Sequence, residues 1–272
     1  MGDTAKRILF VNSEIFPYLP EDDISKIGRF LPQGIQERKK EIRSFMPRYG
    51  CINERKNQLH EVIRLSGMNI IINDVDRPLV IKVASISAAR MQVYFIDNED
   101  YFHRKQVYRD ENGRFFDDNG ERAIFFARGV LETVKKLRWA PDIVHCQGWI
   151  SHVLPLYLKK VYSEDPIFSE SKVILSLYDD IGEETFSEDF KEKLLYGDVT
   201  ADDVAAMEKP DGINLAKLAV SYADGIILGS PDLDSHLVEY CGKSGLPVLP
   251  YDGEALESGA YIDNYNDFYD KF

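Results

Sequence analysis

The chain has 272 residues, of which 44% are hydrophobic and 29% charged, and its formal net charge at pH 7 is -13. This length allows one large domain or two small ones. The acidic charge argues against binding of nucleic acid or of an anionic membrane surface, because both ligands require basic side chains. The cysteines, Cys51, Cys146 and Cys241, are odd in number and far apart, so they indicate neither a disulfide framework nor a metal site.

Neither a signal peptide nor a membrane span is expected, because no apolar run has the required length. We therefore expect a soluble protein of the cytoplasm.

Short apolar runs separated by amphipathic segments recur through most of the chain. Residues 60–74 and 79–86 alternate loosely and predict a small antiparallel meander. Elsewhere the alternation of strands and helices predicts an α/β fold with a doubly wound, mostly parallel sheet and helices on both faces. No linker rich in proline, glycine or serine interrupts this alternation of strands and helices, so we expect one domain over 1–272. The other expected strands are 7–11, 41–46, 91–96, 143–146, 172–177, 225–228 and 246–249.

Helices are expected where apolar residues recur at helical spacing. Residues 24–35 form one such pattern, preceded by acidic residues that can cap a helix. Ser230 and Pro231 predict a cap and first turn for another helix, which runs to Tyr240. The segment 97–120, between the expected strand 91–96 and the expected helix 121–139, is charged and aromatic. Its composition fits either a flap over a substrate or a surface loop that packs against the protein. Further helices are expected over 121–139, 187–195, 200–207, 211–222 and 261–269.

The run 140–160 combines a strand end, a turn at Gly148 and a helix that Ser151 can cap. Ligands of open α/β sheets bind where strands are followed by helices, so a site is expected here. Trp149 beside Gln147 could stack on a sugar ring while the amide binds hydroxyls, but core packing is the stronger interpretation of this tryptophan.

Other chemistries lack their usual signatures. The motifs GxGxxG, GxxxxGK[ST], GxSxG and HExxH do not occur, which disfavours dinucleotide, P-loop, serine-hydrolase and zincin functions. His145, Cys146 and His152 do not have the spacing of metal ligands on one helix face. Adjacent acids such as Glu183 and Glu184 are more typical of a solvated surface than of acid/base catalysis. We expect no cofactor and no metal.

Several segments together resemble the amino-terminal half of bacterial glycogen synthases and plant starch synthases. These retaining glycosyltransferases extend α-1,4-glucan from ADP-glucose. The resemblance implies the first of the two Rossmann-like domains of the GT-B architecture, with the second GT-B domain expected to be absent because the chain stops at Phe272. The segments are RILFVNSEIFPY, FLPQGIQERKKEIRSFMPRYG, QVYFIDNEDYF, DDNGERAIFFARGVLETVKKLRWAPDIVHCQGW, LPLYLKK and NLAKLAVSYADGIILGSP.

The chain departs from this family at three motifs. A Lys-Thr-Gly-Gly element that approaches the donor phosphates in the family corresponds to Pro20, Glu21, Asp22 and Asp23, whose charge would repel a diphosphate. The family's His-Asp-Trp-His motif corresponds to residues 147–150 (QGWI), and its Thr-Ile-His-Asn element corresponds to residues 176–179 (SLYD).

These departures predict a protein of α-glucan metabolism with a binding or regulatory role and without independent glucosyltransferase activity. An alternative is an active transferase that needs a separate second domain, and a third is a structural or signalling domain that lost sugar binding. The expected partners are an α-glucan, an enzyme of glycogen metabolism or a second copy of the chain. No catalytic residue is expected; the expected substrate-binding residues are Ser13, Glu14, Tyr18, His145, Gln147, Trp149, Tyr178 and Asp179.

Overall fold

The computed structural model describes residues 5–272, which form a ten-stranded mixed sheet in the order β10-β9-β8-β7-β1-β2-β6-β5-β3, with β4 paired to β5. All neighbours from β10 to β6 are parallel, which confirms the predicted α/β class. The parallel strands are β1 (Arg7–Asn12), β2 (Glu41–Pro47), β6 (Met91–Asp97), β7 (Ile143–Gln147), β8 (Lys172–Leu177), β9 (Gly225–Leu228) and β10 (Val248–Leu249).

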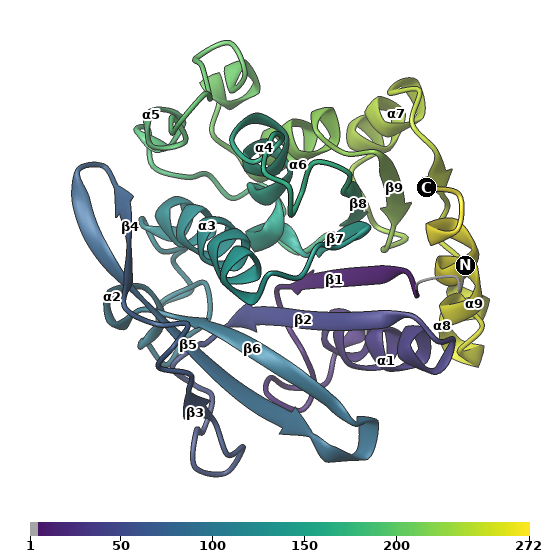
Figure 1. Cartoon of the computed structure of the whole chain (residues 1–272). Helices are drawn as coiled ribbons and strands as arrows, with labels where there is room; N and C mark the ends of the chain where they lie inside the picture. The colour runs from purple at the N-terminus through teal and green to yellow at the C-terminus, as the bar shows by residue number, and fades with distance from the viewer. Residues whose placement is uncertain (1–4) are drawn as a thin grey trace.

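The predicted meander lies at one edge of this sheet. It consists of β3 (His60–Glu61), β4 (Met68–Ile72) and β5 (Val75–Ile86), and β5 pairs antiparallel with β3, β4 and β6. Figure 1 shows this hairpin projecting beyond the parallel part of the sheet.

Helices cover both faces of the sheet, and alternate side chains of β1 belong to the hydrophobic cores on the two faces. Leu9 and Val11 belong to the larger core, and Ile8 and Phe10 to the smaller one on the opposite face. The larger core contains α3 (Asn119–Leu137), α4 (Leu154–Lys160) and α6 (Gly212–Ser221), with α7 (Ser235–Lys243) beside α6. The smaller core is closed by α1 (Asp23–Glu37), α8 (Gly253–Ser258) and α9 (Tyr261–Tyr269), which lie together in Figure 1.

The expected tail helix is confirmed as α9, which docks through polar contacts as well as aromatic packing. The Tyr269 hydroxyl lies 2.7 Å from Nδ1 of His145, whose Nε2 is 2.6 Å from Ser176 Oγ. Lys6 Nζ donates to the carbonyls of Tyr269 and Phe272 at 3.0 Å each. These bonds hold the carboxyl-terminal residues beside the first strand.

Several helix starts differ from the prediction. Ser151 does not cap α4; it lies in a 3-10 turn (η2, Trp149–Ser151), and its hydroxyl donates to the Gly148 carbonyl at 2.7 Å. Ser230 and Pro231 do not begin a helix, because α7 starts later with Asp234 as its cap. The helices expected over 187–195 and 200–207 are shorter in the structure, where they are α5 (Phe190–Lys193) and a 3-10 turn (η3, Ala205–Glu208). Before η3, the Thr200 amide donates to Asp203 Oδ2 at 2.8 Å and closes a turn.

The segment 97–120 is packed against the body of the protein. It contains α2 (Glu99–Phe102), and the bridge between Arg109 and Phe115 closes its remaining loop. Phe115 is buried, which supports the interpretation as a surface loop that packs against the protein.

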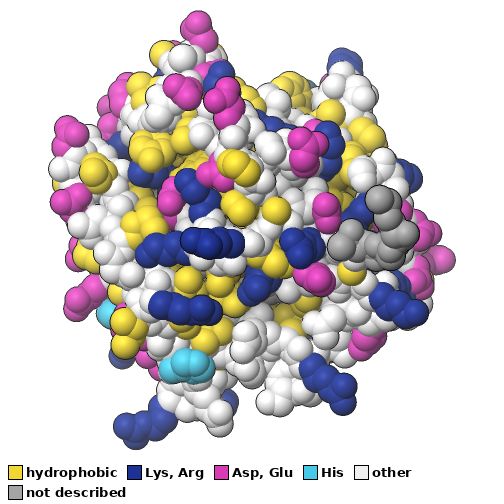
Figure 2. Space-filling view, viewed as in Figure 1, with side chains coloured by type: hydrophobic (Ala, Val, Ile, Leu, Met, Phe, Trp, Pro, Cys, Tyr) yellow, Lys and Arg dark blue, Asp and Glu magenta, His cyan; other side chains and the backbone are white. Residues whose placement is uncertain are grey.

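Charge is unevenly distributed over the surface. On the face shown in Figure 2, Lys and Arg side chains gather across the middle, and Asp and Glu side chains lie mainly around the periphery. Among residues 5–272, no helix is both long and apolar enough to cross a bilayer.

Candidate functional site at the carboxyl edge of the sheet

The carboxyl ends of β1 and β7 lie side by side where the strand order reverses. The two strands pair in parallel up to Asn12 and Gln147, with β2 continuing on one side and β8 on the other. The Ser13 amide donates to the Gln147 carbonyl at 2.8 Å. Such a switch point is where open α/β sheets bind ligands, so the expected location of a site is present in the fold.

Gly148 allows the two strand exits to approach each other closely. Its φ is +85°, and a Cβ atom placed on it would lie 2.1 Å from Ser13 Oγ. The following amide, that of Trp149, donates to Asp180 Oδ2 at 2.8 Å. A side chain at position 148 would therefore face both an unfavourable backbone conformation and a steric clash.

Three acids from separate loops surround this crevice. Burial, together with the nearby charges of Asp22 and Asp180, raises the pKa of Glu14 to about 8. Burial also raises the pKa of Asp180 to about 7, although the hydrogen bond from the Trp149 amide opposes that change. The crevice therefore disfavours ionised acidic groups, including those of an anionic ligand. Within the described part of the chain, no group of three or more His, Cys, Asp or Glu side chains is arranged to hold a metal ion.

The amino terminus of α1 is occupied by a side chain of the protein itself. Asp22 is the N-cap, and its Oδ1 accepts from the Ser25 amide at 2.7 Å, while the Asp22 amide donates to Ser25 Oγ at 2.9 Å. This confirms that the acids before α1 include its cap. Free helix amides at this position are a common binding site for phosphate, and here a carboxylate already uses one of them.

A cavity of about 240 Å³ lies at the same edge of the sheet, beyond β8 and beside the starts of α6 and α7. It is lined in part by His152, Tyr178, Asp179 and Asp234. Both ring nitrogens of His152 and the hydroxyl of Tyr178 are buried and have no hydrogen-bond partner within residues 5–272. Burial lowers the pKa of His152 to about 4, so its ring is neutral at pH 7. A neutral imidazole and a phenol can each donate and accept, which suits hydroxyl groups of an uncharged ligand.

The structure brings some of the predicted binding residues together. Ser13, Glu14 and Gln147 meet at the crevice, where Gln147 Nε2 also donates to the Ile24 carbonyl at 3.1 Å. Tyr178 and Asp179 line the neighbouring cavity.

The remaining predicted residues lie in the packed interior. Trp149 is 1% exposed and contacts the rings of Tyr108, Phe115 and Phe186, so core packing is confirmed and no ring face is free for a sugar. Tyr18 packs edge-on against Phe95 with ring centroids 4.9 Å apart. His145 is fully buried in its bonds to α9 and β8.

Sequence reasoning missed two residues of this edge. Asp180 directly follows Asp179 at a strand exit, but no sequence pattern distinguishes it. The sequence offers His152 only as a possible metal ligand, because its place in the cavity depends on the fold of η2.

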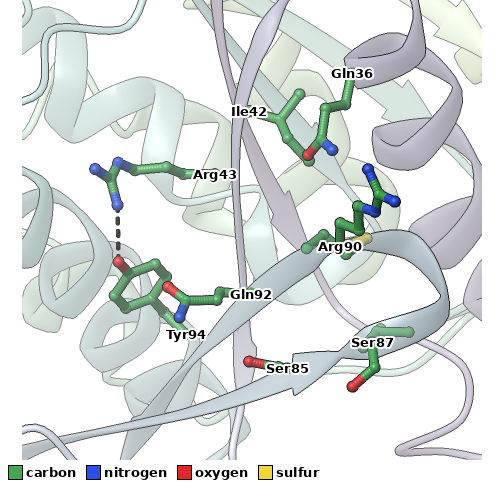
Figure 3. Close-up of a pocket in the computed structure, with 10 residues that line it drawn as sticks. Gln36, Ile42, Arg43, Ser85, Ser87, Arg90, Gln92 and Tyr94 are labelled. Atoms are coloured by element: carbon green, nitrogen blue, oxygen red, sulfur yellow. Dashed lines mark hydrogen bonds between the residues drawn. The ribbon is translucent and has the colours of Figure 1, made fainter.

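A separate cavity of about 420 Å³ lies at the opposite, amino-terminal edge of β2 and β6 (Figure 3). Arg43 turns toward Tyr94 and donates to its hydroxyl at 2.7 Å, whereas Arg90 lies on the other side of the view beside Gln36. The two guanidinium groups diverge and do not form a clamp for one anion.

The family model described as "Starch synthase catalytic domain" matches residues 7–248. The chain belongs to this family. It is 35% identical over 219 residues to a glycogen synthase of Chlorobium limicola, an alignment that covers 80% of this chain and 44% of the relative. A glycogen synthase of Chlorobium phaeovibrioides is 31% identical over 241 residues, covering 88% and 48%. The resemblance stated from the sequence motifs is thereby confirmed.

The fold of the family is also confirmed by a solved structure. The catalytic domain of starch synthase IV from Arabidopsis thaliana, bound to ADP and acarbose, superposes with a TM-score of 0.67 at 13% identity. The match covers 96% of this chain and 50% of that one. The chain thus spans about half the length of the starch and glycogen synthases that it matches.

Proposed function

We propose that this member of the starch synthase family has a binding or regulatory role in α-glucan metabolism and does not itself transfer glucose from ADP-glucose. The observation that supports this most directly is the acidic crevice formed by Glu14, Asp22 and Asp180. Stabilisation of the departing diphosphate is usually the largest contribution to such catalysis. Carboxyl groups in place of a cationic, glycine-rich element work against it.

The cavity beside the crevice supports a neutral ligand in place of a charged donor. His152 and Tyr178 offer uncharged hydrogen-bonding atoms there. A hydroxyl-rich sugar unit can satisfy such atoms without bringing a negative charge next to Asp180.

The proposal is tested by incubating the purified chain with radiolabelled ADP-glucose and glycogen, with the glycogen synthase of Chlorobium limicola as the positive control. We expect no incorporation above background. Incorporation that depends on the purified chain would refute the proposal.

A binding measurement tests whether the acids of the crevice prevent binding of the donor diphosphate. We expect ADP-glucose to give no heat of binding with the wild-type chain in titration calorimetry. At pH 9, where both carboxyl groups are ionised, the isosteric double variant E14Q/D180N removes two negative charges with little change in volume, so it should bind ADP more tightly than the wild type. Equal affinity of the two proteins would show that these acids are not the obstacle.

The alternative of an active half-enzyme is favoured by one observation, namely that the chain aligns with 44% to 48% of the glycogen synthases described above. Addition of the separately purified second half of the Chlorobium limicola enzyme decides between the two functions. Turnover that appears only in the mixture would support the alternative, and its absence supports the binding role.

A further inference from the structure

A large cavity lies on the α1 face of the sheet, away from the carboxyl-edge site. It measures about 600 Å³, within the range of ~300–1,000 Å³ that is usual for small-molecule sites. One wall is a single stripe of α1 that includes Asp23, Lys26 and Phe30, and the other wall is formed by α8, α9 and Tyr251 before them. We call this cavity the α1–α8 groove.

Aromatic rings are exposed on both walls of the α1–α8 groove. Phe30 is 43% exposed and Tyr251 is 38% exposed, while Tyr261 is buried at its base. Two aromatic rings from different elements are exposed to water in the same groove, which is unfavourable. A ligand that covers their flat apolar faces would therefore be stabilised. A pyranose ring presents a flat face of C–H groups that covers such a surface.

The polar residues of the groove match hydroxyl groups. The carboxylates of Asp23 and Glu257 line it, and neither forms an ion pair within residues 5–272. A carboxylate that accepts from a hydroxyl forms a charge-assisted hydrogen bond. The two charges disfavour an anionic ligand, and Lys26, which is also in the lining, forms an ion pair with Glu21 at 3.5 Å.

The walls are held in place by contacts outside the groove. Arg38 Nε donates to Asp263 at 2.7 Å, and Lys40 Nζ donates to Asn266 at 2.6 Å, which fixes α9 on the end of α1. Gly34 is needed at this contact, since a Cβ atom there would lie 2.5 Å from the side chain of Ile262. The α1 and α9 parts of the two walls are thus held together before any ligand binds, which lowers the entropic cost of binding.

The second wall lies outside the segment that defines the family. The family match ends at residue 248, whereas the wall begins at Tyr251. We propose that the α1–α8 groove binds a neutral α-glucan chain, with the exposed rings of Phe30 and Tyr251 as stacking surfaces and Asp23 and Glu257 as hydroxyl acceptors. The location follows from the geometry, and the choice of α-glucan among saccharides depends on the proposed function.

The test is native electrophoresis of the full chain in gels with and without glycogen. The wild type should be retarded by glycogen, and the double variant F30A/Y251A should bind about tenfold more weakly, because each ring contributes a moderate share of the affinity. The matched control is Y240A, since Tyr240 is also 38% exposed but lies on α7. It should be retarded like the wild type.

A second variant distinguishes loss of a binding contact from loss of the folded structure. E257Q removes one charge with little change in shape at an exposed position, and it should weaken binding of maltoheptaose in titration calorimetry. Absence of retardation for the wild type, or equal retardation of wild type and F30A/Y251A, would overturn the proposal. Choline binding that is lost in F30A/Y251A without any glucan binding would overturn it as well. None of these outcomes depends on glucose incorporation, so the two proposals fail separately.

Discussion

Glu14 shows how position alone changes the chemistry of a common side chain. The pKa of its carboxyl group rises from 4.5 to about 8 because of burial and the proximity of Asp22 and Asp180. The folded state therefore holds this proton more tightly than the unfolded chain does. The stability contributed by the proton is present below the unfolded pKa and is lost as the pH rises through the folded pKa.

We expect the free energy of unfolding of the wild type to fall between about pH 5 and about pH 8.5, with Glu14 as one cause. In the variant Glu14→Gln, which mimics the protonated group, this fall should be smaller by on the order of 2 kcal/mol. Urea denaturation at a series of pH values measures the effect. The exposed substitution Glu61→Gln is the control and should leave the wild-type slope unchanged; the same slope in Glu14→Gln would contradict the assigned role.

At the scale of elements, α1 contributes to both candidate sites. Its amino-terminal cap, Asp22, belongs to the acidic crevice, and the next residue, Asp23, begins the wall of the α1–α8 groove. Gly28 on the same helix lies against the exit of β1, where a Cβ atom would be 2.2 Å from the Glu14 carbonyl oxygen. The start of this helix therefore determines where the acids of the crevice lie.

Two substitutions at the cap separate its hydrogen bond from its charge. Asp22→Ala and Asp22→Asn both remove the charge beside Glu14, but asparagine can still accept from the Ser25 amide. We expect Asp22→Ala to be less stable than Asp22→Asn by about 1 kcal/mol, the usual effect of losing an N-cap. Chemical denaturation at one pH compares them, and equal stabilities would mean that the cap does not contribute.

At the scale of the whole molecule, one continuous sheet connects every part of the described chain. The tail helix α9 contacts β1, near the opposite end of the sequence, through Phe10, and it contacts β7, in the middle of the sequence, through His145. Cores on both faces share the strands β1, β7 and β8. Removal of one face would expose the other side of the same strands to solvent, so we propose a single folding unit.

Unfolding should accordingly be one cooperative transition. Fluorescence of Trp139 and Trp149 and far-UV circular dichroism should give the same urea midpoint. Two separated transitions would show that the region around Trp149 and the α1 face unfold as independent units.

The sequence allowed the strands and their order of appearance to be predicted, because buried parallel strands are short apolar runs and need no information from distant residues. The tail helix was predictable for a similar reason, its regular spacing of aromatic residues. The environment of Trp149 was not predictable, since Tyr108, Phe115 and Phe186 come from separate segments. The proximity of Glu14 and Asp180 likewise depends on the order of the strands in the sheet, and local sequence patterns carry no information about that order.

In the motif resemblance described above, Gly148 corresponds to the aspartate of the family's His-Asp-Trp-His motif, and its surroundings determine whether an aspartate could be accommodated there. Introduction of an aspartate alone would push a side chain into Ser13 Oγ, 2.1 Å from the new Cβ, and toward Asp180, at 3.3 Å. The loop would have to take another path, and the hydrogen bond between the Trp149 amide and Asp180 would be lost. An aspartate at position 148 therefore requires coordinated replacement of neighbouring residues, because the single substitution is opposed by both the backbone conformation and the contact with Ser13.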